Sequence, residues 1–211
     1  MEVLLSGLIG YLFGNVNTAY IMGKKHGFDI RSRGSHNAGA SNVVIVLGKK
    51  AGAITAIADI AKAYFAAVFA AIMFPHYRAA KEMAAVSCIL GHIFPFTMRF
   101  KGGKGLACIA GGVLAYDVKV FLILLLIEAV LALVTDYICV MPITASVIIP
   151  VLYALHGGNI LVLNLMVITA GVIIYKHLEN IKRIFKGREA RISFLWNREG
   201  EIERLRESAE E

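Results

Sequence analysis

The sequence predicts an all-α integral membrane protein, and three observations lead to this fold class. The chain has 211 residues, of which 58% are hydrophobic, and its mean hydropathy is +0.68. Only 18% of the residues are charged, a low share for a soluble domain. The charged residues are clustered, so that long apolar stretches lie between them. We therefore expect one bundle of seven transmembrane helices over residues 1–197, followed by a charged tail at 198–211.

Two apolar stretches near the N-terminus predict the first two spans. We expect the first at 3–22, where three glycines would let a neighbouring helix approach closely. The second is expected at 51–74 and contains Asp59 and Lys62. Their i,i+3 spacing places them on one helix face, and charges at membrane depth are costly unless they are paired. We interpret them as an ion pair that fixes helix packing.

Three apolar stretches follow in the middle of the chain. The third span is expected at 83–98, with His92 as a packed, hydrogen-bonded residue. The stretch at 106–116 is too short to cross a bilayer alone, and it completes the count of seven only if the loop before it lies within the membrane boundary. The span expected at 118–135 contains Glu128, which needs an inward partner or a proton at that depth.

The last two spans are expected at 138–155 and 160–175. The first of these contains Pro142 and Pro150, which are typical of helix kinks. A basic segment at 176–191 follows the last span. Its structural interpretation is a basic amphipathic helix beside the membrane, and the alternative is a binding segment.

The charge distribution predicts the orientation of the bundle. The formal net charge is +7, and Lys and Arg gather at 24–50, at 99–104 and after 176. Because cytoplasmic loops carry an excess of these residues, we expect the C-terminus in the cytoplasm and the N-terminus outside. The basic loops favour anionic lipids or anionic substrates over nucleic acid as partners. The three cysteines lack the spacing of a metal site, and we expect them to be small packing residues.

The loop at 100–105 joins two apolar stretches and is built mainly from lysines and glycines. Glycines allow a turn whose N–H groups bind an anion, and a helix that follows adds the positive end of its dipole. The candidates for binding phosphate are Lys101, Gly102, Gly103 and Lys104, with Lys104 as the main point charge. The alternative is a basic loop that only marks the cytoplasmic side. The spacing is not that of a P-loop.

A second donor-rich segment lies at 34–42, where small residues carry hydroxyl and amide groups. Such groups offer several hydrogen bonds to an anion within little space. The candidate residues in this segment are Ser35, Asn37, Gly39, Ser41 and Asn42. The alternative is a flexible linker with turn chemistry.

A third candidate segment follows the last span, where His177 and Asn180 share a helical face. The predicted orientation places all three segments on the same aqueous side. Basic, donor-rich segments at one end of a hydrophobic bundle suggest a substrate with a phosphate head and an apolar tail.

Three motifs occur in order along the chain. The first reads Gly34-Ser35-x-Asn37-x-Gly39-Ala40-Ser41-Asn42, the second combines Gly91-His92-x-Phe94-Pro95 with Lys101-Gly102-Gly103-Lys104-Gly105, and the third reads His177-x-x-Asn180-Ile181-x-Arg183 with Gly187-x-Glu189. Together they resemble the motifs of the bacterial membrane acyl-phosphate:glycerol-3-phosphate acyltransferases. The resemblance runs from the first span to about residue 191.

The resemblance implies a seven-helix enzyme of the bacterial inner membrane, with its active site facing the cytoplasm. Such an enzyme transfers a fatty acyl group from acyl phosphate to the 1-hydroxyl of glycerol 3-phosphate, giving lysophosphatidic acid and phosphate for phospholipid synthesis. No metal or other cofactor is implied, and the partners are the two substrates and membrane lipids. The implied catalytic residues are Ser35, Lys104, His177 and Asn180. The implied substrate-binding residues are Asn37, Gly39, Ser41, Asn42, Lys101, Gly102, Gly103, Arg183 and Glu189.

The chain also departs from the family pattern. Ile45 stands where the family usually has a phosphate-binding arginine, and Cys139 and Pro142 take the places of two serines. These departures keep a second hypothesis open, a divergent paralogue with an altered substrate or a non-catalytic lipid-phosphate-binding role. One-sided clustering of the basic loops does not suit a third hypothesis, an anion transporter. The other large acyltransferase class uses His-x-x-x-x-Asp, and none of the six histidines has an aspartate five positions later.

Overall fold

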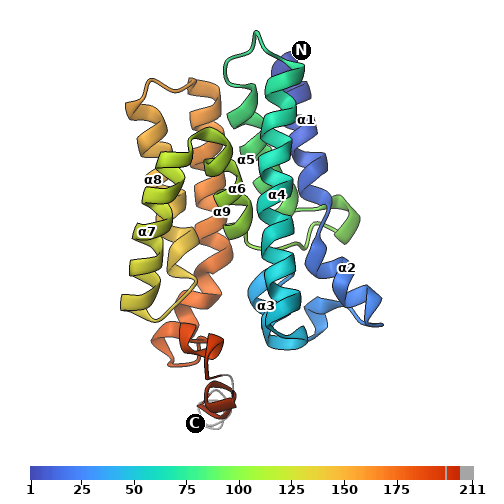
Figure 1. Ribbon diagram of the computed structural model, residues 1–211, viewed down its shortest axis with the longest axis vertical. Helices are drawn as coiled ribbons and strands as arrows, with labels where there is room; N and C mark the ends of the chain where they lie inside the picture. Colours follow the sequence, from blue (N-terminus) through green and yellow to red (C-terminus); the bar gives the residue numbers. More distant parts are fainter. Residues whose placement is uncertain (198, 205–211) are drawn as a thin grey trace.

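Figure 1 shows a bundle of helices in this computed structural model, which describes residues 1–197 and 199–204. Every regular element in these residues is a helix, so the all-α prediction is confirmed. The α-helices are α1 (Glu2–Asn15), α2 (Thr18–Lys25), α3 (Ala40–Leu47), α4 (Lys49–Met73), α5 (Ala80–Ile93), α6 (Leu106–Tyr116), α7 (Val118–Thr135), α8 (Val140–Leu155) and α9 (Ile160–Phe185). The short 3₁₀ helices are η1 (Ile30–Ser32), η2 (Phe96–Met98) and η3 (Ile192–Leu195).

The two ends of the bundle differ in what they carry. At one end lie α2, α3, the turn between α7 and α8, and the last turns of α9 (Figure 1). The N-terminus and the turn between α8 and α9 lie at the opposite end. The basic segments at 24–50 and after 176 are therefore gathered at one end of the bundle.

Three helices in the described residues are long and apolar enough to cross a membrane, namely α4, α7 and α9. The helices α6 and α8 are apolar but shorter. At about 1.5 Å per residue, the 11 residues of α6 reach about half of the roughly 30 Å hydrocarbon core. Large apolar side chains are exposed along α7, including Leu126, Leu133 and Val134, as expected for a surface that contacts lipid.

The expected first span at 3–22 is not continuous. The helix α1 ends at Asn15, and α2 begins two residues after Val16. The Asn17 side chain caps α2 by accepting a hydrogen bond from the Tyr20 N–H at 2.8 Å. The Val16 carbonyl, released from the helix, accepts a hydrogen bond from Lys62 Nζ at 2.7 Å. A buried lysine on α4 thus compensates for the break.

One other expected boundary is wrong. The third span was expected to reach residue 98, but α5 ends at Ile93, before Pro95 and η2. The last span was expected at 160–175 with a basic amphipathic helix after it, and the two form one uninterrupted helix, α9, which ends at Phe185. The basic segment is therefore the final part of a helix of 26 residues. Its binding residues are rigidly connected to the hydrophobic part of the bundle.

Close contact between α1 and α5 confirms the role predicted for the glycines. A Cβ atom at Gly10 would lie 2.0 Å from the Ala84 carbonyl oxygen. One at Gly14 would lie 2.3 Å from the Cys88 carbonyl oxygen. Only glycine allows the two backbones to come this close.

The charged residues predicted inside the spans have partners. Lys62 Nζ lies 2.6 Å from Asp59 Oδ1, and both side chains are buried. Glu128 on α7 accepts a hydrogen bond from the Thr144 hydroxyl of α8 at 2.6 Å. Pro142 lies in the first turn of α8, where its missing N–H removes no helical hydrogen bond, whereas Pro150 lies inside the helix.

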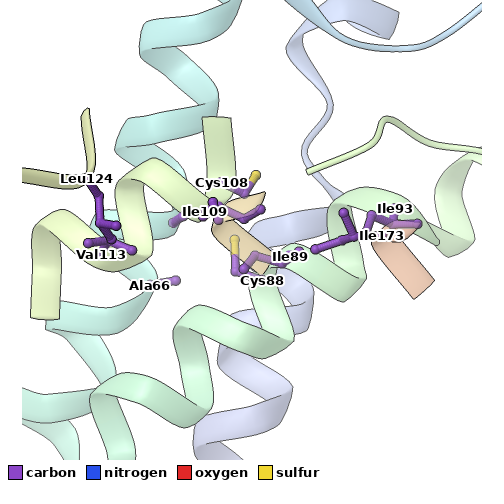
Figure 2. Close-up of a cluster of buried hydrophobic side chains, with 11 residues drawn as sticks. Ala66, Cys88, Ile89, Ile93, Cys108, Ile109, Val113, Leu124 and Ile173 are labelled. Atoms are coloured by element: carbon purple, nitrogen blue, oxygen red, sulfur yellow. The ribbon is translucent and has the colours of Figure 1, made fainter. Parts of the chain in front are cut away.

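An apolar core fills the middle of the bundle. Figure 2 shows that α5 and α6 contribute Cys88, Ile89, Cys108 and Ile109, with Ile173 of α9 beside them. All three cysteines are free and buried, and the two in the core are the packing residues that the sequence predicted. This core lies one helical turn from His177 and so supports one side of the site.

Candidate functional site

One pocket collects most of the predicted site residues at the end of the bundle that carries the basic segments. Nine of the thirteen line it, namely Ser35, Asn37, Gly39, Ser41, Lys104, His177, Asn180, Arg183 and Glu189. The first four come from the loop before α3 and the start of that helix, Lys104 precedes α6, and the others belong to α9 and the loop after it. The first turn of α6 also lines the pocket. Its unpaired N–H groups add the positive end of a helix dipole.

A chain of hydrogen bonds joins the polar residues of this pocket. Lys104 Nζ donates to Asn180 Oδ1. Asn180 Nδ2 donates to Glu189 Oε1 at 2.5 Å, and Arg183 Nε donates to Glu189 Oε2 at 2.7 Å. Asn180 and Glu189 are each only 8% exposed. The carboxylate of Glu189 therefore fixes both the amide that orients Lys104 and the guanidinium beside it.

The environment of Lys104 makes its charge unusually available to an anion. Burial and the nearby Arg183 together lower the pKa of Lys104 to about 8, although Glu189 acts in the opposite direction. An ammonium group that has lost part of its hydration gains more from a phosphate than an exposed one does.

His177 is held in one tautomer by its own helix. Its Nδ1 lies 2.7 Å from the Ile173 carbonyl oxygen, so Nδ1 carries the hydrogen and donates it. In the neutral ring, Nε2 is then a hydrogen-bond acceptor. The ring is 2% exposed and lines the pocket, so it can accept a hydrogen bond from a substrate hydroxyl.

Asn42 lies outside the pocket, because its amide is used to fold the loop before α3. Its Oδ1 accepts the Ser35 N–H at 2.7 Å, and its Nδ2 donates to the carbonyls of Ile30 and Arg33 at 3.0 Å each. Asn42 is completely buried. Its contribution is to present Ser35, which is exposed at the pocket.

The two glycines before Lys104 also have a different function from the one predicted. The Gly102 N–H donates to the Ile93 carbonyl at 3.0 Å, and the Gly103 N–H donates to the His92 carbonyl at 3.1 Å. These amides are therefore not free donors for an anion. A Cβ atom at Gly102 would lie 2.0 Å from the His92 carbonyl oxygen, and one at Gly103 would lie 2.1 Å from His92 Nε2. Glycine is needed because the loop lies directly on α5.

A second hollow lies on the other side of Lys104. It shares Asn37 and Lys104 with the first pocket and is strongly basic. Its other lining residues are Arg31, His36, Met98, Arg99, Lys101, Gly102, Gly103 and Lys176. Two adjoining hollows that share one lysine suit two anionic groups held next to each other. Lys101, Gly102 and Gly103, which do not reach the first pocket, belong here.

The first pocket also contains residues to which the sequence gave only structural roles. Asp59 and His92 line it, and Lys62 Nζ lies between them, 2.6 Å from Asp59 Oδ1 and 2.9 Å from His92 Nδ1. Asp59, His92 and Cys108 offer ligand atoms within 4.8 Å of one another, a geometry that could hold a metal ion. The Lys62 ammonium already lies next to Asp59 and His92, so two of these three side chains have a positively charged neighbour. The i,i+3 spacing of Asp59 and Lys62 predicted the ion pair, but nothing in the sequence indicated that Asp59 lines the pocket.

The three departures from the expected motifs all face this pocket. Ile45, Cys139 and Pro142 line it, so each contributes an apolar or weakly polar surface beside the phosphate-binding groups. The Cys139 thiol is free and only 8% exposed.

Comparisons with known proteins agree with this site. The family described as glycerol-3-phosphate acyltransferase matches residues 4–187. Glycerol-3-phosphate acyltransferase 1 of Oceanobacillus iheyensis is 34% identical over 94% of this chain and 99% of its own length. Glycerol-3-phosphate acyltransferase of Thermoanaerobacter sp. (strain X514) is 34% identical over 91% of this chain and 96% of its own length.

Solved structures give the same answer. The crystal structure of PlsY (YgiH), an integral membrane glycerol 3-phosphate acyltransferase, in its glycerol 3-phosphate form has a TM-score of 0.82 and 32% identity, covering 92% of this chain and 98% of that one. Its lysophosphatidic acid form has a TM-score of 0.77, also at 32% identity, covering 90% and 95%. With the apolar helices of the bundle, these similarities identify a bacterial membrane protein. They favour an acyltransferase over the divergent, non-catalytic paralogue. The chain belongs to the glycerol-3-phosphate acyltransferase family.

Proposed function

We propose that this protein transfers a fatty acyl group from acyl phosphate to the 1-hydroxyl of glycerol 3-phosphate, giving lysophosphatidic acid and phosphate. The observation that carries the proposal is the pair of adjoining hollows that share Lys104, the second of which is strongly basic. Both substrates carry a phosphate, and each would occupy one hollow. The relatives are named for acyl transfer to glycerol 3-phosphate, and the solved neighbour exists in a glycerol 3-phosphate form and a lysophosphatidic acid form.

The reaction needs positioning and charge stabilisation rather than a covalent intermediate with the protein. The glycerol hydroxyl oxygen attacks the acyl carbonyl carbon, the bond from that carbon to the phosphate oxygen breaks, and phosphate leaves. The hydroxyl proton passes to a substrate phosphate, so no protein base is required. Two reactants held side by side gain most of the rate from orientation, and donors placed at the developing negative charge supply much of the remainder.

The proposed roles follow from the position of each group. The Lys104 ammonium would neutralise the leaving phosphate, and the Ser35 hydroxyl would donate to the same anion. Asn180 and Glu189 would keep Lys104 and Arg183 in place through the bonds described above. His177 Nε2, as an acceptor, would orient the glycerol hydroxyl. The side chains of Lys101 and Lys176 would bind phosphate in the second hollow.

The topology forms part of the same proposal. We propose seven crossings of the bacterial inner membrane, with the N-terminus outside and the site and the C-terminus facing the cytoplasm. Supporting this, the basic segments are gathered at one end of the bundle and the N-terminus lies at the other (Figure 1). Single cysteines at Lys25 and Arg78, labelled from each side of oriented vesicles, test the orientation. Labelling of both residues from the same side would contradict it.

Turnover by the purified protein in lipid vesicles tests the reaction. Acyl phosphate and glycerol 3-phosphate are supplied, and phosphate and lysophosphatidic acid are measured together in a one-to-one ratio. Lys104→Ala is expected to abolish turnover, and Lys119→Ala, an exposed lysine near the other end of the bundle, is expected to leave it unchanged. Absence of product from a folded protein that binds phosphate would overturn the proposed reaction. Full activity of Lys104→Ala would overturn the assignment of the site.

A further inference from the structure

The segment after α9 turns back and covers the site. The chain reverses at Gly187, where φ is +68°, and then forms η3 at Ile192–Leu195. The Ile192 N–H donates to the Asp136 carbonyl at 2.8 Å, which anchors the segment beside the turn between α7 and α8. Phe194 is 6% exposed and lines the first pocket. Figure 1 places this segment directly beyond the end of α9.

Two residues of the tail, Glu201 and Arg204, bind the backbone of the loop at 187–191. Arg204 donates through Nη1 to the Gly187 carbonyl at 2.6 Å and through Nη2 to the Glu189 carbonyl at 2.7 Å. The same guanidinium binds both carboxylate oxygens of Glu201, at 2.6 and 2.9 Å. Glu201 in turn accepts the Arg191 N–H at 2.8 Å. A two-pronged arginine–carboxylate pair has a fixed geometry, so it fixes the backbone groups that it binds.

The loop that this pair holds carries the central residue of the site. The Glu189 backbone is bound by Arg204, while its side chain binds Asn180 and Arg183. Asn180 in turn accepts the hydrogen bond from Lys104. An unbroken series of bonds therefore runs from the tail to the phosphate-binding lysine.

We infer that Glu201 and Arg204 form a positioning clamp for Glu189, and through Glu189 for Arg183, Asn180 and Lys104. The clamp lies beyond residue 187, where the family match ends, so it is a feature that the family motifs do not include. Neither residue touches the pocket. Both act by fixing the loop. Glu201 is 6% exposed, and although burial raises its pKa, the interactions with Arg204 and Arg191 together outweigh this and lower the pKa below its ordinary value. The pair therefore stays ionised at neutral pH. This inference rests on the pocket being the substrate site proposed above.

Steady-state kinetics of Arg204→Ala test the clamp. Loss of two charge-assisted hydrogen bonds to the loop is expected to raise KM for a phosphate substrate by about tenfold. Arg204→Lys keeps the charge but can form only some of the hydrogen bonds that Arg204 makes, so its KM should lie between those of the wild type and Arg204→Ala. Glu203→Gln is the matched control, because Glu203 is exposed on the same turn. A wild-type KM in Arg204→Ala would overturn the inference.

A double-mutant cycle separates positioning from a general structural effect. If Arg204 acts through Glu189, Arg204→Ala should have little additional effect in a Glu189→Gln protein. Additive losses in KM would overturn the inference, as would an Arg204→Ala defect explained entirely by a lower unfolding temperature.

The rise in unfolding temperature caused by inorganic phosphate provides a readout that does not need turnover. It should be smaller in Arg204→Ala than in the wild type and unchanged in Glu203→Gln. If the wild type makes no product but the effects of phosphate on unfolding temperature are as expected, the proposed reaction is contradicted and the clamp is still supported. If the wild type turns over and Arg204→Ala matches it, the clamp fails and the reaction remains.

Discussion

Lys104, just before α6, donates a hydrogen bond to the side chain of Asn180, 76 residues later on α9. The bond connects the second sequence motif, which contains Lys104, with the third, which contains Asn180. Because Asn180 also donates to Glu189, its amide has only one orientation that satisfies both neighbours. The position of the lysine charge is therefore set by a neutral residue on another helix.

This relationship predicts the effect of replacing Asn180. Asn180→Ala leaves Lys104 without its acceptor and the buried Glu189 carboxylate without one of its donors. We expect kcat/KM to fall by about 10²-fold, the size seen when a group that stabilises transition-state charge is removed. Phosphate release in vesicles is the measurement. Wild-type activity would show that the Lys104 orientation does not matter.

The lowered pKa of Lys104 predicts a pH limit. With a pKa of about 8 in the folded protein, Lys104 is charged below that pH and loses its charge as the pH rises through it. Inhibition by inorganic phosphate should therefore weaken between about pH 7 and 9, because binding to the free enzyme reports the pKa of the free enzyme.

Lys104→Arg provides the comparison, since arginine stays charged throughout this range. Its inhibition constant should be higher than that of the wild type, because the fork geometry differs, but it should be constant from pH 7 to 9. The same alkaline decline in Lys104→Arg would assign the titration to another group.

The glycine-lysine loop predicts a contrast between two glycine substitutions. Gly103→Ala would place a methyl group 2.1 Å from His92 Nε2 and 2.8 Å from the Ala38 carbonyl oxygen, so the loop must move. Gly171→Ala, on α9, would meet nothing within 4 Å and should stabilise the helix by about 0.5–1 kcal/mol. The turnover rate and the unfolding temperature of both variants are the measurements; both should fall in Gly103→Ala, and the unfolding temperature should rise in Gly171→Ala. An active Gly103→Ala would show that the loop tolerates displacement.

The buried Lys62 of α4 predicts a stability effect. Lys62→Met removes the partner of Asp59 and the donor to the Val16 carbonyl. We expect a loss of about 3–5 kcal/mol, because a buried carboxylate is left unpaired. Adding Asp59→Asn should recover part of this loss. The denaturant midpoint in detergent is the measurement, and a double variant less stable than Lys62→Met would contradict the pairing argument.

Local sequence patterns determined much of this fold. The bounds expected for the helices at 106–116 and 118–135 agree with α6 and α7, whose N-caps are Gly105 and Asp117. The break in the first span could not be predicted, since its compensation comes from Lys62, 46 residues after Val16. The basic helix expected after residue 175 continues directly from the last span in α9, because a change from apolar to basic residues marks a membrane boundary without ending a helix.

For the site, the sequence identified the residue types but not how each one is used. Hydroxyl, amide and ammonium groups, together with the resemblance of the ordered motifs, predicted nine of the residues that line one pocket. Whether a polar group faces that pocket depends on neighbours distant in sequence. Asn42 is used by the carbonyls of its own loop, and the amides of Gly102 and Gly103 by α5. The contribution of the tail depends on Arg204 reaching the loop after α9, which no periodic pattern indicates.

The shortness of α6 has a consequence for how an oily substrate arrives. In the proposed topology, α6 ends at the outer surface of the membrane and is only 11 residues long. Lys104, just before α6, therefore lies deeper in the membrane than the headgroups of the cytoplasmic leaflet. An acyl phosphate could then present its head to Lys104 while its hydrocarbon chain stays in the leaflet. Acyl phosphate would then reach the site, and lysophosphatidic acid would leave it, by lateral diffusion within one leaflet. Only glycerol 3-phosphate and the released phosphate would pass through the opening to the aqueous phase.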